Sequence, residues 1–457
     1  MSGRLISLRL LPLFILLSWV FLPTQVDARS LSHRLNGLFG GNGVWLDVQE
    51  PTENPFRPGT FFPSHTAHFS SDSLARLSLL VQQLAPNAAD FPALSTVPGF
   101  TYAFNPELDE FERSSNSLGS VFVERPRTIG AGRFALGVSY AFVDFQELDG
   151  EDLDGLSFNL THGDCCPGSA VGEDGEGFPS HGDPIFEKDT ADIIFENFSL
   201  ESHVASFFGT YGISERWDIN FLLPVVSTSL DVRALARLNN EASSKAFGRG
   251  IHYFDNEAGV TLANDYIDSN KAGIGDLLLR TKYHLVQYTE FNAAVGLALR
   301  LPTGDEDDFQ GLGDTVVSPF FGASYEYDQF HVHVSGGIDI NGDDLDRSRV
   351  RYGLGASYHV IEELAFIVDI IGSSQLATDK LSVEIRRHRN DPVTGEIFEL
   401  EPVTQTAGLR TDIIDLAIGF KAAPFDSFTL FAQFLVPLNN DGLRTDFIPM
   451  GGLEFSF

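Results

Sequence analysis

The sequence has little sulfur, little positive charge and, after its first residues, no long hydrophobic run. Cysteine occurs only as the adjacent pair Cys165 and Cys166, so disulfide bonds cannot staple distant loops together. The 30 Lys and Arg residues face 63 Asp and Glu residues, and the net charge of −33 argues against nucleic acid as a partner. No stretch after the N-terminal region approaches the roughly 18 apolar residues of a spanning helix, which excludes a helical membrane protein.

The first 28 residues have the pattern of a secretory signal peptide. Arg4 and Arg9 precede the apolar run LLPLFILLSWVFL, and the small residues Val26 and Ala28 follow it. We therefore expect residues 1–28 to be removed by cleavage after Ala28. An uncleaved membrane anchor fits less well, because the apolar run is short and a cleavage-like site follows.

Residues 132–457 break into segments of alternating apolar and polar residues, which is the pattern of transmembrane barrel strands. The 43 glycines and 40 phenylalanines suit strands and turns, whereas methionine is nearly absent. We predict an all-β fold, an antiparallel transmembrane β-barrel of 12 strands, an even number as single-chain bacterial barrels require. The expected strands are 132–145, 197–212, 216–232, 274–287, 290–302, 314–326, 329–341, 348–360, 363–376, 410–423, 426–438 and 445–457.

The connections between these segments alternate in length, as they do in outer-membrane barrels with short periplasmic turns and longer outer loops. If the last strand ends in the periplasm, the five short links are periplasmic and the six longer ones lie outside. The longer links are 146–196, 233–273, 303–313, 342–347, 377–409 and 439–444. The pieces LSVEIRRH and EIFELEPV within 377–409 can form a further hairpin, so fourteen strands are the alternative.

Alternation also assigns the two faces of each strand. Leu297 and Leu299 are expected to face lipid, whereas Arg300 of the same strand faces the lumen. Charge gathers on the inward side because it is costly in lipid. The predicted lumen-lining residues are Arg280, Lys282, Arg300, His331, His333, Asp339, Arg349, Arg351 and Lys421. Inward leucines and phenylalanines make this lumen amphipathic, which suits an apolar solute better than a salt porin would.

Residues 29–131 lack the clear alternation of barrel strands. The piece SSDSLARLSLLVQQLAP predicts a short helix with an apolar stripe through Leu77, Val81 and Leu84 and with Pro86 beyond its end. Proline-rich flanks indicate irregular structure around it. We predict either an N-terminal plug that fills the barrel or a periplasmic extension.

The C-terminal sequence GGLEFSF alternates up to a terminal phenylalanine, as outer-membrane barrels do at this end. Met450, Gly452, Phe455 and Phe457 fall at the spacing of the signal read by the barrel-assembly machinery, which we expect to be a partner. Outer-membrane lipids and small solutes are the other expected partners, and the expected location is the bacterial outer membrane.

Three polar motifs are candidates for metal sites. The stretch LPTGDEDDFQGLGD holds five carboxylates, but the fifth, sixth and twelfth positions of a calcium loop starting at Asp305 hold Phe309, Gln310 and Val316. His331 and His333 point the same way along a strand, yet no third ligand is specified. The adjacent cysteines are expected either to form a strained vicinal disulfide, to bridge two chains or to stay free. We expect no metal site and no cofactor.

Two glycine-rich hairpins carry a family resemblance. The pieces GIGDLLLRTKYHL, GLALRLPTGDEDD and GLGDTVVSPFFGASYEY, followed by regular hairpins to a terminal phenylalanine, resemble the outer-membrane family associated with meta-pathway degradation of phenol. The resemblance covers roughly 130–457, and it implies a barrel that passes small, often aromatic, organic compounds. It leaves 29–131 uncovered, and a plug in that region would resemble the long-chain fatty-acid transporters.

We therefore expect an outer-membrane channel for uptake of small hydrophobic or aromatic compounds, and not an enzyme. The first alternative is a structural or adhesive barrel that acts through its acidic outer loops. The second is a lipid-modifying enzyme, which needs a serine or histidine beside an acid. Ser202 and His203 are expected on opposite faces of one strand, and no triad spacing emerges.

Overall fold

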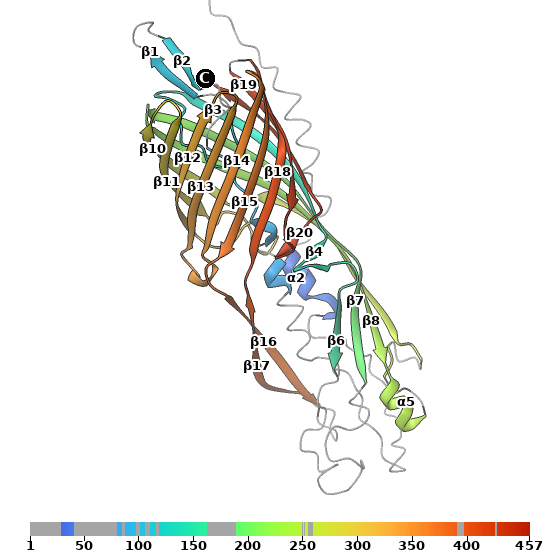
Figure 1. Ribbon diagram of the computed structural model, residues 1–457. Helices are drawn as coiled ribbons and strands as arrows, with labels where there is room; N and C mark the ends of the chain where they lie inside the picture. Colours follow the sequence, from blue (N-terminus) through green and yellow to red (C-terminus); the bar gives the residue numbers. More distant parts are fainter. Residues whose placement is uncertain are drawn as a thin grey trace, which may run out of the picture.

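Twelve antiparallel strands close into a barrel, as the alternation predicts (Figure 1). The computed structural model describes residues 29–40, 80–84, 87–96, 101–105, 110–115, 118–161, 189–248, 250, 252–254, 259–390, 397–425 and 427–457. The expected signal peptide, the cysteine pair and the first part of the predicted helix lie outside these residues.

Each barrel strand pairs with the next along the ring, and β21 pairs with β3 to close it. The ring consists, in order, of β3 (Phe134–Phe145), β7 (Thr190–Ser214), β8 (Trp217–Asn239), β10 (Leu277–Gln287), β11 (Phe291–Leu301), β12 (Val316–Tyr327), β13 (Phe330–Asn341), β14 (Arg349–Ile361), β15 (Leu364–Gln375), β18 (Asp412–Phe425), β19 (Phe428–Pro437) and β21 (Ile448–Ser456). The predicted count of 12 strands is confirmed.

The outer surface of the ring is apolar. In β11, Val295 and Leu297 are exposed, whereas Ala294 and Ala298 are buried on the lumen side. The same alternation runs through β10 and β14, where Tyr283, Leu285 and Leu354 are exposed. A continuous apolar surface around a closed barrel is stable only in contact with lipid. The barrel strands therefore span a membrane.

The two ends of the barrel differ. The links after β7, β10, β12, β14 and β18 join one strand to the next within three residues, and we call this the short-turn end. The opposite, long-link end carries the longer connections, which the sequence places outside the cell. In Figure 1 the C-terminus and the hairpin of β1 (Thr101–Asn105) and β2 (Glu110–Ser115) lie near the short-turn end.

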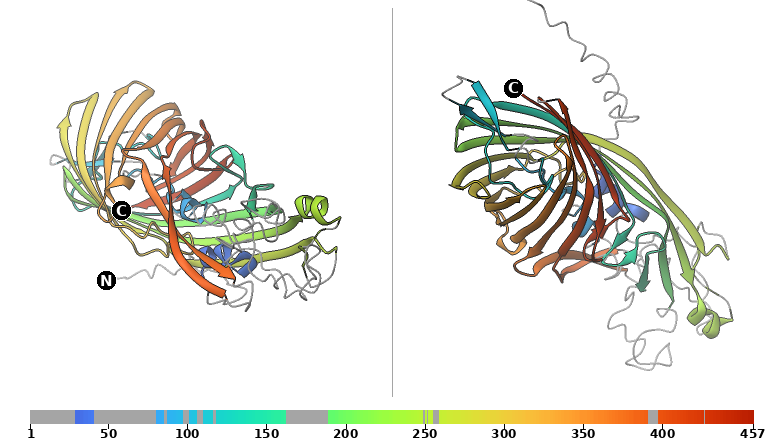
Figure 2. Two further views of the ribbon diagram at one scale, coloured as in Figure 1. Left: turned by 90° about the horizontal axis from the view of Figure 1, so that it is seen from below. Right: turned by 45° about the horizontal axis from the view of Figure 1, so that its top comes forward.

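Strands β7 and β8 are longer than the predicted 197–212 and 216–232, and this is a correction to the sequence analysis. They run past the ring at the long-link end toward α5 (Glu241–Phe247), where they pair with β6 (Ser157–Thr161) and with β9 (Leu262–Ile274) (Figures 1 and 2). We call β6, β9 and the parts of β7 and β8 paired with them the extension. Its strands have polar outer residues such as Asp192 and buried inner ones such as Ile193, because this part faces water.

The hairpin predicted within 377–409 forms, but it does not enlarge the barrel. Strands β16 (Asp379–Asn390) and β17 (Ile397–Leu409) pair only with each other among the described strands, while β15 pairs directly with β18. The fourteen-strand alternative is therefore not realised in the ring. A small sheet of β4 (Glu147–Leu148), β5 (Glu151–Asp152) and β20 (Leu443–Arg444) and the 3-10 turn η3 (Leu345–Arg347) complete the long-link end.

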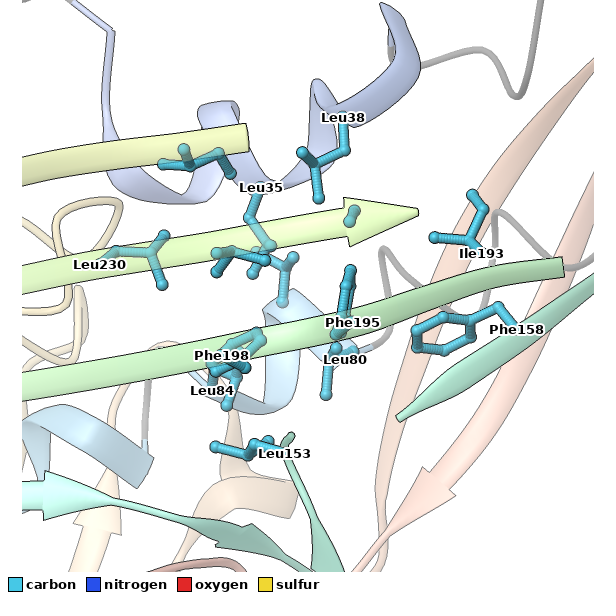
Figure 3. Packing of buried hydrophobic residues seen from close by; sticks show 14 of the residues in the cluster. Leu35, Leu38, Leu80, Leu84, Leu153, Phe158, Ile193, Phe195, Phe198 and Leu230 are labelled. Atoms are coloured by element: carbon cyan, nitrogen blue, oxygen red, sulfur yellow. The ribbon is translucent and has the colours of Figure 1, made fainter. Parts of the chain in front are cut away.

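A hydrophobic core fills the concave side of the extension. Leu31, Leu35 and Leu38 of α2 (Leu31–Asn36) and η1 (Leu38–Gly40) join it, as do the leucines of the helical turn 80–84. Figure 3 shows Leu80 and Leu84 beside Phe195 and Phe198 of β7. We call this cluster the extension core.

No helix in the described part of the chain is both long and apolar enough to cross a membrane.

Candidate functional site

Two stretches of the N-terminal region lie inside the barrel. We call residues 87–96 and 118–130 the inner segment, because their side chains and backbone contact inward-facing residues of the strands. The two stretches also contact each other, since Ser95 N donates to Val121 O at 2.8 Å. A plug would occupy this position, and the division of the chain into residues 1–28, 29–131 and 132–457, with 29–131 as a plug or a periplasmic extension, stays a prediction.

A buried ion pair holds the inner segment to β10. The ammonium of Lys282 donates to Glu124 Oε1 at 2.9 Å, to Thr96 Oγ1 at 2.9 Å and to Arg125 O at 2.8 Å. Thr96 N donates to the other carboxylate oxygen of Glu124 at 2.9 Å. Burial alone raises the pKa of Glu124, but the nearby Lys282 and Arg280 outweigh it, so this pKa is lowered overall. Glu124 is thus held as an anion inside the lumen.

Asp369 of β15 forms a second anchor. Its Oδ2 accepts a hydrogen bond from Ser120 Oγ at 2.7 Å and from the backbone N–H groups of Val121 and Phe122 at 3.3 Å each. Three donors on one carboxylate oxygen fix the turn at 120–122 against the wall. A third anchor lies nearer the short-turn end. There the Nε of Arg127 donates to Glu326 Oε1 at 2.9 Å, and its Nη2 donates to Glu326 Oε2 at 3.0 Å.

Glycines in the wall make room for the inner segment. A Cβ at Gly322 would lie 2.8 Å from Glu124 O, and one at Gly353 would lie 3.0 Å from a methyl group of Val123. Side chains at these positions would therefore collide with the inner segment or displace it. The close approach explains why glycine replaces larger inward residues in β12 and β14.

Between the inner segment and the long-link end, the lumen holds a cavity of about 270 Å³. Its wall is largely apolar, with Phe91, Phe122, Leu278, Phe320 and Ile371, and it also carries several arginines. Leu94, Phe122 and Glu124 border it on the side of the inner segment. A cavity that combines apolar walls with a few placed polar groups is the usual form of a small-molecule site.

Asp90 of the inner segment projects into this cavity against three arginines. Its Oδ1 lies 2.7 Å from Arg351 Nη2 and 3.5 Å from Arg300 Nη1, and its Oδ2 bonds to Arg349 Nη1. Burial raises the pKa of Asp90, but the positive charges of Arg351, Arg349 and Arg300 outweigh it and hold this pKa well below its usual value. Arg351 also bonds to Asp339 of β13.

The structure places the nine predicted lumen residues as follows. Arg280, Lys282, His331, His333 and Lys421 are buried, and Arg300, Asp339, Arg349 and Arg351 are half-buried. Five of them contact the inner segment, namely Arg280 through Leu94 O at 2.5 Å, Lys282 through Glu124, and Arg300, Arg349 and Arg351 through Asp90. Sequence reasoning missed Asp90 and Glu124, which carry these contacts.

Three histidines of the barrel wall lie together nearer the short-turn end, away from the cavity, namely His331, His333 and His359. The rings of His331 and His359 are 4.8 Å apart, and His333 lies on the same strand as His331. Among the described residues, no group of three or more His, Cys, Asp or Glu residues has the arrangement of a metal site. The histidine cluster therefore adds no ligand set to the candidate site.

The acidic hairpin at 303–313 contacts the N-terminal helix. Leu31 N donates to Asp308 Oδ1 at 2.9 Å, and Ser32 Oγ donates to Asp307 Oδ1 at 2.7 Å. Carboxylates at a helix N-terminus accept its free N–H groups.

At the other end of the chain, Met450 is buried in the lumen while Phe455 and Phe457 are exposed on the outer face.

Several solved structures resemble this chain at low sequence identity. An outer membrane channel from Pseudomonas putida F1 is 13% identical, with 72% of this chain and 97% of that chain covered and a TM-score of 0.40. The CymD monoaromatic hydrocarbon channel is 11% identical, with 73% and 91% covered and a TM-score of 0.32. A Pseudomonas aeruginosa FadL homologue is 10% identical, with 71% and 89% covered and a TM-score of 0.29.

The sequence comparison gives a family. No curated protein matches the chain. Residues 192–391, from the extension of β7 to the β16–β17 hairpin, match the model of the family described as "Putative MetA-pathway of phenol degradation". The family resemblance expected from the glycine-rich hairpins is thereby confirmed, and the protein is an outer-membrane β-barrel that resembles this family.

Proposed function

We propose that the protein is an outer-membrane channel for uptake of small hydrophobic or aromatic organic compounds. The cavity of about 270 Å³ in the lumen is the observation that carries this proposal. An apolar cavity of roughly 150 Å³ already admits benzene, so this one has room for a substituted ring. The family description, which names phenol degradation, agrees with a solute of that kind.

The inner segment determines where such a solute would stop. Leu94, Phe122 and Glu124 line the cavity on the side of the short-turn end. Passage toward that end therefore requires a rearrangement of the inner segment, while the barrel wall stays closed. The channel is thus one in which occupancy of the cavity precedes transit.

Uptake by intact cells tests this proposal, because lipopolysaccharide slows the entry of hydrophobic compounds through the outer leaflet. A strain that lacks the gene is compared with the same strain carrying the gene on a plasmid. We expect faster initial uptake of labelled small aromatic compounds in the complemented strain at low external concentration. Equal rates in the two strains over a broad panel of aromatic and aliphatic compounds would contradict the proposal.

The extension supports a second candidate, an adhesive barrel. Strands β7, β8 and β9 project beyond the ring with a packed core of their own, which is more structure than a solubilising loop needs. Removal of the extension should then abolish binding to a surface partner while the ring still folds. We also propose that the protein is not an enzyme. Ser202 Oγ lies 3.5 Å from Thr228 Oγ1, and His203 Nδ1 lies 2.6 Å from Tyr140 OH, so each has a different partner.

A further inference from the structure

We propose that the lumenal cavity binds organic carboxylates, and that Asp90 occupies the carboxylate position until such a solute displaces it. This inference rests on the proposed channel function and deepens it by naming a solute class. Displacement of Asp90 would detach residues 87–96 from the wall, so binding of the solute and release of the inner segment would be one event.

The geometry around Asp90 is that of a ligand in its site. One carboxylate, on a segment with no pairing to the barrel strands, meets guanidiniums from two of them, Arg300 on β11 and both Arg349 and Arg351 on β14. Guanidinium groups bind carboxylates with N–H donors held in a fixed planar arrangement. A solute carboxylate could accept the same hydrogen bonds.

The charges in the cavity explain why Asp90 needs a replacement when it leaves. Within the described residues, the ion pairs of Arg300 and Arg349 are with Asp90, whereas Arg351 also has Asp339. All three guanidiniums are at least two-thirds screened from solvent. An uncompensated charge in such a place is strongly unfavourable. Asp90 therefore leaves at low cost only when another anion takes its position.

The other lining residues select among anions. Phe91, Phe320 and Leu278 present apolar surface to the body of the solute. Asp314 and Asp415 line the same cavity, but each is already paired, with Arg347 at 3.2 Å and with Arg444 at 2.9 Å, so these arginines offer no free partner to a second negative charge. The favoured solute is thus a monocarboxylate with an apolar or aromatic body, rather than phosphate or a dicarboxylate. The cavity of about 270 Å³ limits that body to about the size of one ring with substituents.

The test measures binding of benzoate to the full chain in detergent micelles by isothermal titration calorimetry, with benzyl alcohol as the neutral probe of the same shape. We expect saturable binding of benzoate and at least about tenfold weaker binding of benzyl alcohol. Asp90→Asn should tighten benzoate binding about tenfold, because it removes the internal competitor. Arg349→Gln should weaken it by at least the same factor, and Arg349→Lys should weaken it less.

The matched control is Asp305→Asn, which makes the same change of charge at the same end of the barrel but outside the cavity, and it should leave the benzoate affinity unchanged. Equal affinity for benzoate and benzyl alcohol would overturn the proposal, and so would unaltered benzoate binding by Asp90→Asn. Retention of the heat-modifiable mobility of a folded barrel shows that Arg349→Gln has folded. Uptake of toluene without benzoate binding would contradict this inference alone, whereas loss of both would contradict the channel function as well.

Discussion

At the scale of single residues, the inner segment is held by charges that are buried together with their partners. Lys282 is nearly inaccessible and donates to Glu124, Thr96 and the carbonyl of Arg125. Removal of one member of such a group leaves the others buried and unpaired, which costs more than the intact pair ever contributes. These residues should therefore be far more sensitive to single substitutions than to paired ones.

Replacement of Lys282 tests this sensitivity. We expect Lys282→Met to lower the free energy of unfolding by about 3–5 kcal/mol, because Glu124 keeps its charge without a partner. The double variant with Glu124→Gln should recover much of that loss. Unfolding by urea in lipid vesicles, followed by tryptophan fluorescence, provides the measurement. Lys245→Met, at the exposed pair with Glu241 on α5, is the control and should have no measurable effect. Absence of recovery in the double variant would refute the pairing argument.

Asp90 gives a prediction about pH. The pKa of Asp90 is lowered from the usual value of 3.8 by the three arginines around it, so the native state favours the charged form more than the unfolded chain does. The stability it contributes is therefore fully present above about pH 5 and declines as pH falls below about 4. The difference in unfolding free energy between the wild type and Asp90→Asn should be constant from pH 5 to 8 and should shrink below pH 4. A difference that grows on acidification would show that the sign is wrong.

At the scale of elements, the sequence predicted the barrel wall and missed what the wall encloses. Alternation was sufficient for the wall because lipid forces residues such as Leu297 outward and leaves Arg300 on the lumen side. The same criterion failed in the extension, where Ile193 points to a core and Asp192 to water, so that no apolar outer face marks the strand.

Asp90 and Glu124 were missed for a different reason. Both lie in a segment without periodicity, and nothing local distinguishes them from the other carboxylates of an acidic chain. One signal was present: Arg349 and Arg351 of β14 share Asp339 as their acid on the neighbouring strand, which is one acid for two bases. A surplus of lumenal bases implies that an acid comes from outside the wall, which favours a plug over a periplasmic extension.

The acidic hairpin also makes an element-scale prediction. Its carboxylates at Asp307 and Asp308 hold the N-terminus of α2, so the double change Asp307→Asn with Asp308→Asn should loosen that helix. We expect faster hydrogen exchange of the amides at 31–36, measured by mass spectrometry. Asp305→Asn is the control, because its carboxylate accepts from Asp307 N within the turn and does not touch α2. Equal exchange rates in all three proteins would show that the hairpin does not hold the helix.

A tight, saturable calcium complex lost in Asp307→Asn would instead restore the metal-site interpretation.

At the scale of the whole molecule, the chain consists of two parts that are stabilised differently. The ring is closed by continuous strand pairing and faces lipid, whereas the extension is held by a hydrophobic core like that of a water-soluble protein. The inner segment connects them, because residues 80–84 pack in the extension core while 87–96 line the lumenal cavity. Loss of the extension core should therefore release residues 87–96 of the inner segment without opening the ring.

Phe195 is the residue that best separates the two parts. Its side chain is fully buried in the extension core, with ring centroids 5.6 Å from Phe158 and 5.5 Å from Phe198. Truncation of such a residue costs about 3–5 kcal/mol. We expect Phe195→Ala to accelerate hydrogen exchange at 190–200 and 80–84 while exchange at 291–301 in β11 stays unchanged. Phe321→Ala, which truncates a lipid-facing ring of β12, should leave exchange in the extension unaltered. Phe195→Ala could instead raise hydrogen exchange by the same factor in the extension and in β11, which would show that the ring and the extension unfold as one unit. In that case, solute binding in the cavity would have to disturb the whole barrel to move the inner segment.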